Sequence, residues 1–179
     1  AVYNFNVTHE SSMWKRDREE LKVNPNDLKM IPPVFPDDSI VRHSLAVNYS
    51  NLIEMDRQVG DLVKTLKKEG LYENSYIFFY SDHGGPFPRH KRAIYETGTK
   101  VPFFVKLPNG KKEKIDNEQF LSFVDFAPTV LSIADIEIPS EYQGIPFLGK
   151  FKSENKREYL FTSSAVSYTH LTLPTTPVV

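Results

Sequence analysis

The chain has 179 residues, of which 40% are hydrophobic, and this length suits one domain or part of one. Its 22 basic and 23 acidic residues give a formal net charge of -1, so no overall field favours nucleic acid or an anionic membrane. Without cysteine the chain cannot form disulfides, thiolate metal sites or a cysteine nucleophile, and no apolar run reaches the ~18 residues of a membrane span.

The first part of the chain predicts a strand followed by a long loop. Residues 1–7 alternate apolar and polar side chains, which predicts a strand that ends at a loop presenting His9. This strand-like start, without methionine or a leader, leads us to expect an N-terminus that has been cut. Four prolines between Asn24 and Asp38 predict a surface loop, and Asp38 is suited to cap a following helix.

The remaining elements alternate between helix and strand patterns. Apolar residues spaced three, four and seven apart predict a long amphipathic helix from Val41 to Leu66 that stops at Gly70. Unbroken apolar runs predict buried strands, and Asp125 opens a further predicted helix through about Ala134. The predicted strands are Tyr76–Tyr80, Val101–Val105 and Glu158–Phe161. This alternation predicts an α/β domain with a largely parallel sheet.

A polar motif follows the first of these buried runs. Asp82 and His83 are adjacent in a turn after the strand, where ligands usually bind in α/β proteins, so both side chains can converge on one divalent cation. Gly84 and Gly85 permit positive φ angles and a close approach of the backbone to a ligand. The carboxylate suits Ca2+ or Mg2+, whereas the imidazole suits Mn2+ or Zn2+, and more ligands are needed for any of these ions.

A basic cluster lies a few residues beyond the metal motif and predicts a local site for sulfate or phosphate oxygens. It consists of Arg89, His90, Lys91, Arg92 and Lys100. His90 and Lys91 are the expected anion contacts, and a lysine can also donate a proton to a leaving group. A solvated basic loop beside a tight turn is the alternative.

Several short segments, in their order and spacing, resemble the sulfatase family of the alkaline-phosphatase-like superfamily. The segments are Phe5–Glu10, Met55–Gly60, Phe79–Gly84, Lys91–Gly98, Val101–Phe103 and Ser122–Thr129. The resemblance covers nearly everything before residue 165. It implies a partial alkaline-phosphatase-like α/β/α sandwich with a largely parallel, mixed sheet whose early strands are missing.

The resemblance also implies roles for individual residues. Asp82 and His83 are similar to the family's second pair of metal ligands, most often for Ca2+, with Mn2+ as the alternative. Lys91, in a Lys-x-x-x-Tyr-Glu pattern, resembles the lysine that contacts the sulfate and assists the leaving group. His9 resembles a histidine that binds the sulfate.

The departures from the family pattern define what the chain lacks. The family's nucleophile is a formylglycine made from Cys or Ser in a Cys/Ser-x-Pro-x-Arg motif, and neither this motif nor the first metal-binding aspartate pair occurs here. We therefore expect an inactive fragment of a sulfuric ester hydrolase. The intact enzyme would act on a sulfated small molecule or sulfated carbohydrate, with no nucleic-acid partner. The resemblance is compatible with a periplasmic or secreted protein.

Two other functions are compatible with the same residues. A phosphonate monoester or phosphodiester hydrolase of the same superfamily would suit His83 and a manganese site. A non-catalytic module that binds a metal or an anion would explain the missing nucleophile.

The last stretch of the chain differs from the rest in composition. Residues 160–179 contain no Asp, Glu, Lys or Arg, and Val166–Thr176 resembles a translated sequencing adapter. We therefore predict a partial sulfatase catalytic domain over residues 1–164 and a non-native or disordered tail over 165–179, in which His170 has no function. An ordinary edge strand followed by a flexible tail is the alternative.

Overall fold

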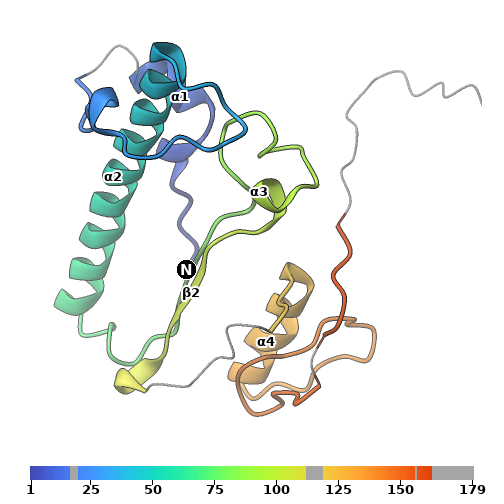
Figure 1. Cartoon of the computed structure of the whole chain (residues 1–179). Coiled ribbons are helices and arrows are strands. Elements are labelled where there is room, and N and C mark those ends of the chain that lie inside the picture. Colours follow the sequence, from blue (N-terminus) through green and yellow to red (C-terminus); the bar gives the residue numbers. More distant parts are fainter. Residues whose placement is uncertain (17–19, 112–118, 156, 163–179) are drawn as a thin grey trace, which may run out of the picture. The chain divides into compact units, whose positions relative to one another are not determined.

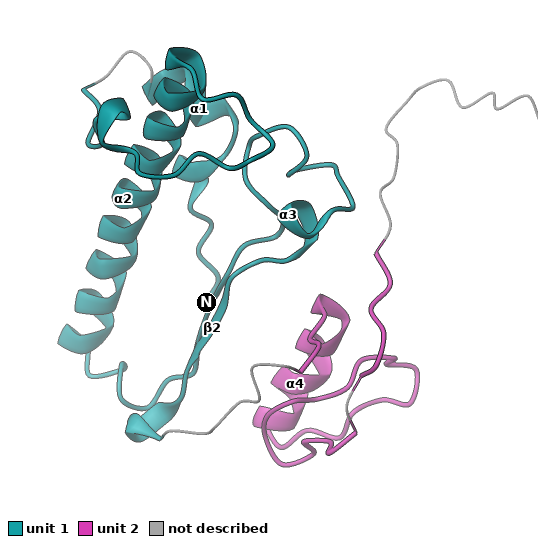
Figure 2. Ribbon diagram, in the orientation of Figure 1, with its two compact units in different colours: residues 1–111, 166–179 teal, residues 112–165 magenta. Residues whose placement is uncertain are grey.

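The computed structural model describes residues 1–16, 20–111, 119–155 and 157–162. These residues form two compact units, one within 1–111 and the other within 112–165 (Figure 2). The adapter-like tail and His170 lie outside the described residues, so the domain limits at 164 and 165 stay a prediction.

The elements of the two units are as follows (Figure 1). The first unit contains η1 (Asn6–Thr8), α1 (Ser11–Arg16), η2 (Pro25–Asp27), α2 (Ser39–Lys68), β1 (Ile77–Tyr80), α3 (Glu96–Thr99), β2 (Phe103–Lys106) and η3 (Pro108–Gly110). The second unit contains η4 (Phe123–Asp125) and α4 (Phe126–Ile133). None of these helices is both long and apolar enough to cross a membrane.

Helix α2 confirms the predicted long amphipathic helix and its end signals. Asp38 Oδ1 accepts two backbone N–H bonds of the first turn, each 2.9 Å long, which satisfies donors that have no partner within the helix. At the other end Gly70 adopts a φ of +69°, and the Leu71 N–H reaches back to the Leu66 carbonyl at 2.9 Å. A left-handed residue after the last turn is the usual glycine-dependent way to end a helix.

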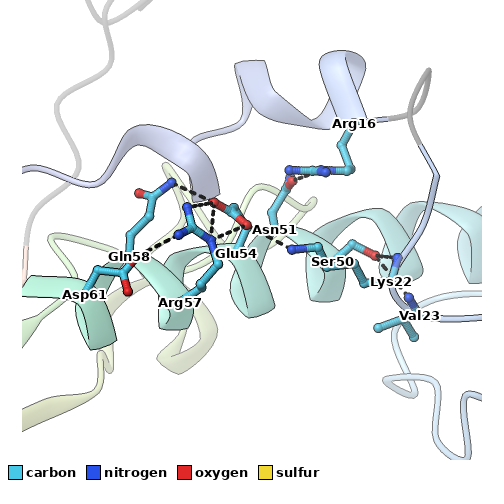
Figure 3. Close-up of polar contacts among 9 residues, drawn as sticks. All are labelled: Arg16, Lys22, Val23, Ser50, Asn51, Glu54, Arg57, Gln58 and Asp61. Atoms are coloured by element: carbon cyan, nitrogen blue, oxygen red, sulfur yellow. Dashed lines mark hydrogen bonds and ion pairs between the residues drawn. The ribbon is translucent and has the colours of Figure 1, made fainter. Parts of the chain in front are cut away.

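The segment before α2 docks on this helix through buried polar groups (Figure 3). Ser50 is fully buried, and its Oγ accepts the backbone N–H groups of Lys22 (3.0 Å) and Val23 (3.3 Å) while donating to the Ala46 carbonyl (2.7 Å). One turn of helix thus fixes the path of residues 22 and 23. The apolar side chains beside it, Leu45, Ala46 and Val47, are buried as well.

Two further contacts extend this docking along α2. Arg16, the last residue of α1, donates from Nε to Asn51 Oδ1 at 3.0 Å. Lys22 Nζ donates to Glu54 Oε2 at 2.9 Å, and Arg57 also bonds Glu54, with a shortest distance of 2.7 Å. The hydrogen bonds from Arg57, and then that from Lys22, hold the pKa of the Glu54 carboxyl far below its usual value of 4.5.

The two described strands pair antiparallel, with Ile77 opposite Lys106 and Tyr80 opposite Phe103. The predicted parallel arrangement is therefore not found among the described strands. An unbroken apolar run indicates that both faces of a strand are covered, but it carries no information on strand direction. A parallel connection usually runs through a crossover helix, whereas residues 81–102 contain only the four-residue α3.

Two predicted strands are wrong. Residues 1–5 have no regular structure and lead into the 3-10 turn η1, and residues 158–161 are also irregular. Alternating or apolar sequence makes a strand only where a neighbouring strand accepts its backbone hydrogen bonds. Tyr159 and Phe161 are accordingly 72% and 94% exposed.

The second unit is organised around a buried carboxylate. Asp125 is 1% exposed, and it accepts the backbone N–H groups of Ser122 (2.9 Å) and Ile145 (2.8 Å) and an Nη2 bond from Arg157 (2.5 Å). These bonds tie the turn before α4 to two later segments. The predicted helix after Asp125 is confirmed as α4, with Pro128 in its first turn.

The replacement Glu54→Gln tests the ion pairs on α2. Because the folded state lowers the pKa of Glu54, the stabilisation from its carboxylate is fully present above pH 4.5 and is lost as the pH falls below that value. Lowering the pH from about 6 to about 3 should therefore reduce the melting temperature of the wild type more than that of Glu54→Gln. Circular dichroism melts measure this, with the exposed Glu69→Gln at the end of α2 as the control. Equal losses in wild type and Glu54→Gln would contradict the assignment.

Candidate functional site

The loop between β1 and β2 carries the predicted metal and anion residues. Its two sides are in close contact, since the Gly84 N–H donates to the Gly98 carbonyl at 2.9 Å. A Cβ atom added to Gly84 would lie 1.8 Å from the Thr97 carbonyl oxygen, and one added to Gly98 would lie 2.1 Å from that of Ala93. No side chain fits at either position, so these glycines set the shape of the loop.

The structure corrects the expected reason for the two glycines after His83. Neither Gly84 nor Gly85 has a positive φ. Gly84 is required by the close approach to Thr97, whereas the nearest atoms to a Cβ at Gly85 lie at an ordinary 3.8 Å. The left-handed residues of this loop are Arg89 and Arg92, with φ angles of +66° and +67°. Such angles are unusual for residues with side chains and occur where the surrounding structure imposes them.

Asp82 and His83 present two donor atoms to one place. His83 Nδ1 lies 2.8 Å from the Gly84 carbonyl, and because a carbonyl only accepts, Nδ1 carries the proton. In the neutral ring the lone pair of His83 is therefore on Nε2, which lies 3.5 Å from Asp82 Oδ2. The Asp82 side chain is 83% exposed, so its oxygens are accessible.

This pair fits part of a divalent-metal site. A nitrogen lone pair and a carboxylate oxygen share one volume, and the hydrogen bond from Nδ1 fixes the ring as metal-ligating histidines require. Calcium needs six to eight ligands, however. Within the described residues no group of three or more His, Asp or Glu side chains is placed to hold an ion. The described residues thus offer two candidate ligands and not a complete site.

Lys91 and His9, 82 positions apart in sequence, meet in the structure. The Lys91 N–H donates to the Gly85 carbonyl at 3.1 Å, which connects this residue to the glycines after His83. Its Nζ lies 3.4 Å from His9 Nε2. His9 sits between η1 and α1, the segment that Arg16 attaches to α2. Figure 1 shows α1 and the loop with α3 at the same end of the first unit.

The hydrogen bonds of His9 determine what its ring offers to Lys91. The Ser11 N–H donates to His9 Nδ1 at 3.2 Å, and Ser11 Oγ lies 2.9 Å from the same nitrogen. Because Nδ1 accepts, the proton of the neutral ring is on Nε2. His9 Nε2 and Lys91 Nζ are therefore two donors directed to one place, and an anion is the ligand that satisfies both.

Glu10 is the residue that sequence reasoning missed. Its Oε1 lies 3.3 Å from Lys91 Nζ and 3.3 Å from Arg92 Nη2. The hydrogen bond from Lys91 lowers the pKa of the Glu10 carboxyl, with a smaller contribution from the charge of Arg92. The sequence did contain one indication of this role. Glu10 directly follows His9, just as Arg92 directly follows Lys91, so an acid adjoins one candidate site residue and a base adjoins the other.

The rest of the predicted basic cluster does not converge on His9. His90 stacks on Phe35 at 6.0 Å between ring centroids and packs edge-on against Phe87, while its Nδ1 donates to the Pro88 carbonyl at 3.0 Å. The Arg89 guanidinium lies 4.6 Å from the centre of the Tyr95 ring. Of this cluster, Lys91 and Arg92 are the residues whose side chains meet, and both contact the Glu10 carboxylate.

Comparison with known proteins identifies the family. The family model described as Sulfatase matches residues 6–136, a range that contains His9, Asp82, His83 and Lys91. The chain belongs to the sulfatase family. The predicted family is therefore confirmed, and with it an alkaline-phosphatase-like α/β fold class, although the described part of the chain contains no parallel strand pair.

Individual sulfatases show how much of a family member this chain represents. It is 39% identical to an ulvan-active sulfatase of Formosa agariphila over 199 residues. This match covers 92% of this chain and 33% of that protein. It is 31% identical to human N-sulphoglucosamine sulphohydrolase, over 62% of this chain and 22% of that protein. It is also 31% identical to an N-acetylglucosamine-6-O-sulfatase of Bacteroides thetaiotaomicron, over 60% of this chain and 20% of that protein. The chain spans a third or less of the length of these relatives.

The two adjacent glycines after His83 provide a matched test of the loop geometry. Gly84→Ala should destabilise this sulfatase chain by about 1–3 kcal/mol, because the new methyl group must displace the Thr97 backbone. Gly85→Ala should be nearly neutral, since its Cβ makes only ordinary contacts. Urea denaturation of the two variants measures the difference. Equal stability of the two would show that residues 84 and 97 are not in close contact.

Proposed function

We propose that this chain supplies the sulfate-binding side of the active site of a sulfuric ester hydrolase. The observation that carries the proposal is the convergence of His9 Nε2 and Lys91 Nζ, 3.4 Å apart, in a chain of the sulfatase family. Lys91 Nζ is a donor, and His9 Nε2 is a donor because His9 Nδ1 accepts the Ser11 N–H. A sulfate ester presents three terminal oxygens that only accept hydrogen bonds. The pair is thus suited to hold one end of a sulfate ester.

The reaction cleaves the bond between sulfur and the ester oxygen with the net addition of water. Negative charge develops on the ester oxygen as that bond breaks, and a positioned ammonium stabilises such charge or donates a proton to it. Lys91 is the residue proposed for this task. His9, through its Nε2–H, would bind a sulfate oxygen that does not leave.

Asp82 and His83 would provide two of the ligands for a divalent cation, with Ca2+ preferred and Mn2+ as the alternative. Their geometry supports this assignment because the lone pair of His83 faces the Asp82 carboxylate. A bound cation would withdraw charge from the sulfate oxygens. The other ligands would come from sequence outside this chain.

The nucleophile is also proposed to lie outside this chain. The chain has no cysteine and no Ser-x-Pro-x-Arg sequence, so a formylglycine of the family type cannot form from its residues. The shares of 20% to 33% of the relatives' length leave room for a separate segment that carries it. We accordingly expect the isolated chain to be inactive.

The substrate class we propose is a sulfated carbohydrate. The support comes from the relatives, whose names refer to ulvan, to N-sulphoglucosamine and to N-acetylglucosamine 6-O-sulfate. A sulfated small molecule is the broader alternative.

Lys91→Ala in the full-length gene product tests the proposal. We expect kcat for p-nitrophenyl sulfate and for a sulfated oligosaccharide to fall by about 10²- to 10⁴-fold, as for loss of a general acid. The fold should stay intact, and Lys68→Ala at the end of α2 serves as the control. If the wild-type enzyme instead cleaves bis(p-nitrophenyl) phosphate faster than p-nitrophenyl sulfate, the alternative function, a phosphodiester hydrolase, is correct. If neither ester is cleaved and an anion still binds, the non-catalytic module is correct.

Asp82→Ala tests the metal assignment separately. Removal of one of two described ligand side chains should weaken Ca2+ or Mn2+ binding by about 10- to 100-fold or more and abolish turnover. Isothermal titration of the metal-free protein with each cation measures the affinity. Asp27→Ala, on the exposed turn η2, is the matched control. Unchanged affinity and turnover in Asp82→Ala would remove Asp82 from the site.

A further inference from the structure

Glu10 lies at the centre of a group of charged residues formed by two pairs of sequence neighbours. His9 and Glu10 come from the turn before α1, and Lys91 and Arg92 come from the loop after β1. Glu10 Oε1 is 3.3 Å from Lys91 Nζ and 3.3 Å from Arg92 Nη2. One carboxylate oxygen therefore bonds both cations.

His9 cannot hold Lys91 in place by itself. Its Nδ1 accepts the Ser11 N–H, so that Nε2 carries a proton and faces the Lys91 ammonium as a second donor. Two donors 3.4 Å apart do not attract each other until an acceptor arrives. The contact that orients Lys91 Nζ towards His9 is therefore the one with Glu10.

The surroundings of the two side chains favour a defined position for this contact. The Lys91 and Glu10 side chains are only 19% and 29% exposed, whereas that of Arg92 is 75% exposed. The Met13 N–H donates to the Glu10 carbonyl at 3.1 Å, which fixes the Glu10 backbone at the start of α1. Arg92 is held at a φ of +67°, so its direction is set by the loop.

We propose that Glu10 is a positioning residue of the sulfatase site, which holds the Lys91 ammonium beside His9 Nε2 and offsets one of the two positive charges there. This role rests on the proposed function, because Glu10 would orient Lys91 towards the ester oxygen of the proposed substrate. Glu10 does not touch the substrate. It acts through Lys91, and it keeps the charge of the group at one positive unit instead of two.

The test uses Glu10→Gln and Glu10→Asp in the full-length gene product, with p-nitrophenyl sulfate for turnover and inorganic sulfate for binding. Glu10→Gln removes the charge but keeps the size, so kcat should fall about tenfold while the Kd for sulfate decreases, because the carboxylate no longer offsets the positive charge of Lys91 and Arg92. Glu10→Asp keeps the charge but shortens the reach, so kcat should fall without tighter sulfate binding. In a Lys91→Ala background, Glu10→Gln should cause no further loss of kcat. Glu69→Gln, an exposed glutamate at the end of α2, is the control.

Each alternative result has a defined meaning. Wild-type kcat and Kd in both Glu10 variants would overturn the inference, and so would an equal loss of kcat with and without Lys91. A parallel loss of kcat, sulfate affinity and melting temperature would show a structural role only. If the wild type cleaves no sulfate ester, the proposed function fails. The Kd for sulfate alone then decides whether Glu10 influences anion binding. Unchanged Kd in Glu10→Gln would in that case overturn the role of Glu10 as well.

Discussion

The docking of Arg16, Lys22 and Val23 on α2 is the interaction on which the candidate site depends. Ser50, fully buried, accepts two backbone N–H groups of this segment, and Asn51 receives the Arg16 side chain. Buried polar groups that are paired in this way tolerate few alternative arrangements, because each shift leaves a donor or acceptor without a partner. The short turn before α1 is thereby fixed, and with it His9. Two buried, uncharged polar side chains of α2 thus help to position His9, which lies seven residues before Arg16.

The direction of their hydrogen bonds explains why His9 and Lys91 are proposed as an anion-binding pair and are not partners of each other. The ring proton of His9 is directed towards the Lys91 ammonium, so the two groups offer hydrogen bonds to the same place without satisfying each other. Glu10 compensates part of this positive charge from the side. The chain as a whole is nearly neutral, with a formal charge of -1, so the proposed anion recognition would depend on this local arrangement.

The loop after β1 contributes rigidity. The backbone contacts at Gly84 and Gly98 leave no space for a side chain, and the Lys91 N–H is bonded to the Gly85 carbonyl. The two metal-ligand candidates and the candidate sulfate contact therefore belong to one hydrogen-bonded loop. Sites held within a fraction of an ångström by their surroundings bind and react better than flexible ones. The donor atoms of Asp82 and His83 would nevertheless be only part of the proposed metal site, in a chain that spans a third or less of the length of these relatives.

The sequence by itself determined the family, the extent and caps of α2, and the candidates His9, Asp82, His83 and Lys91, because these depend on periodicity, local capping chemistry and motif spacing. Only the tertiary structure decided the direction of β1 and β2 and the loss of the predicted strands at residues 1–7 and 158–161. Strand pairing is a long-range choice that an apolar run does not encode. Tertiary contacts also separated Lys91 from His90, which have the same local sequence context but different partners, Glu10 and Phe35. The role inferred for Glu10 became visible for the same reason, since Lys91 and Arg92 lie 81 and 82 positions away in sequence and are brought close only by folding.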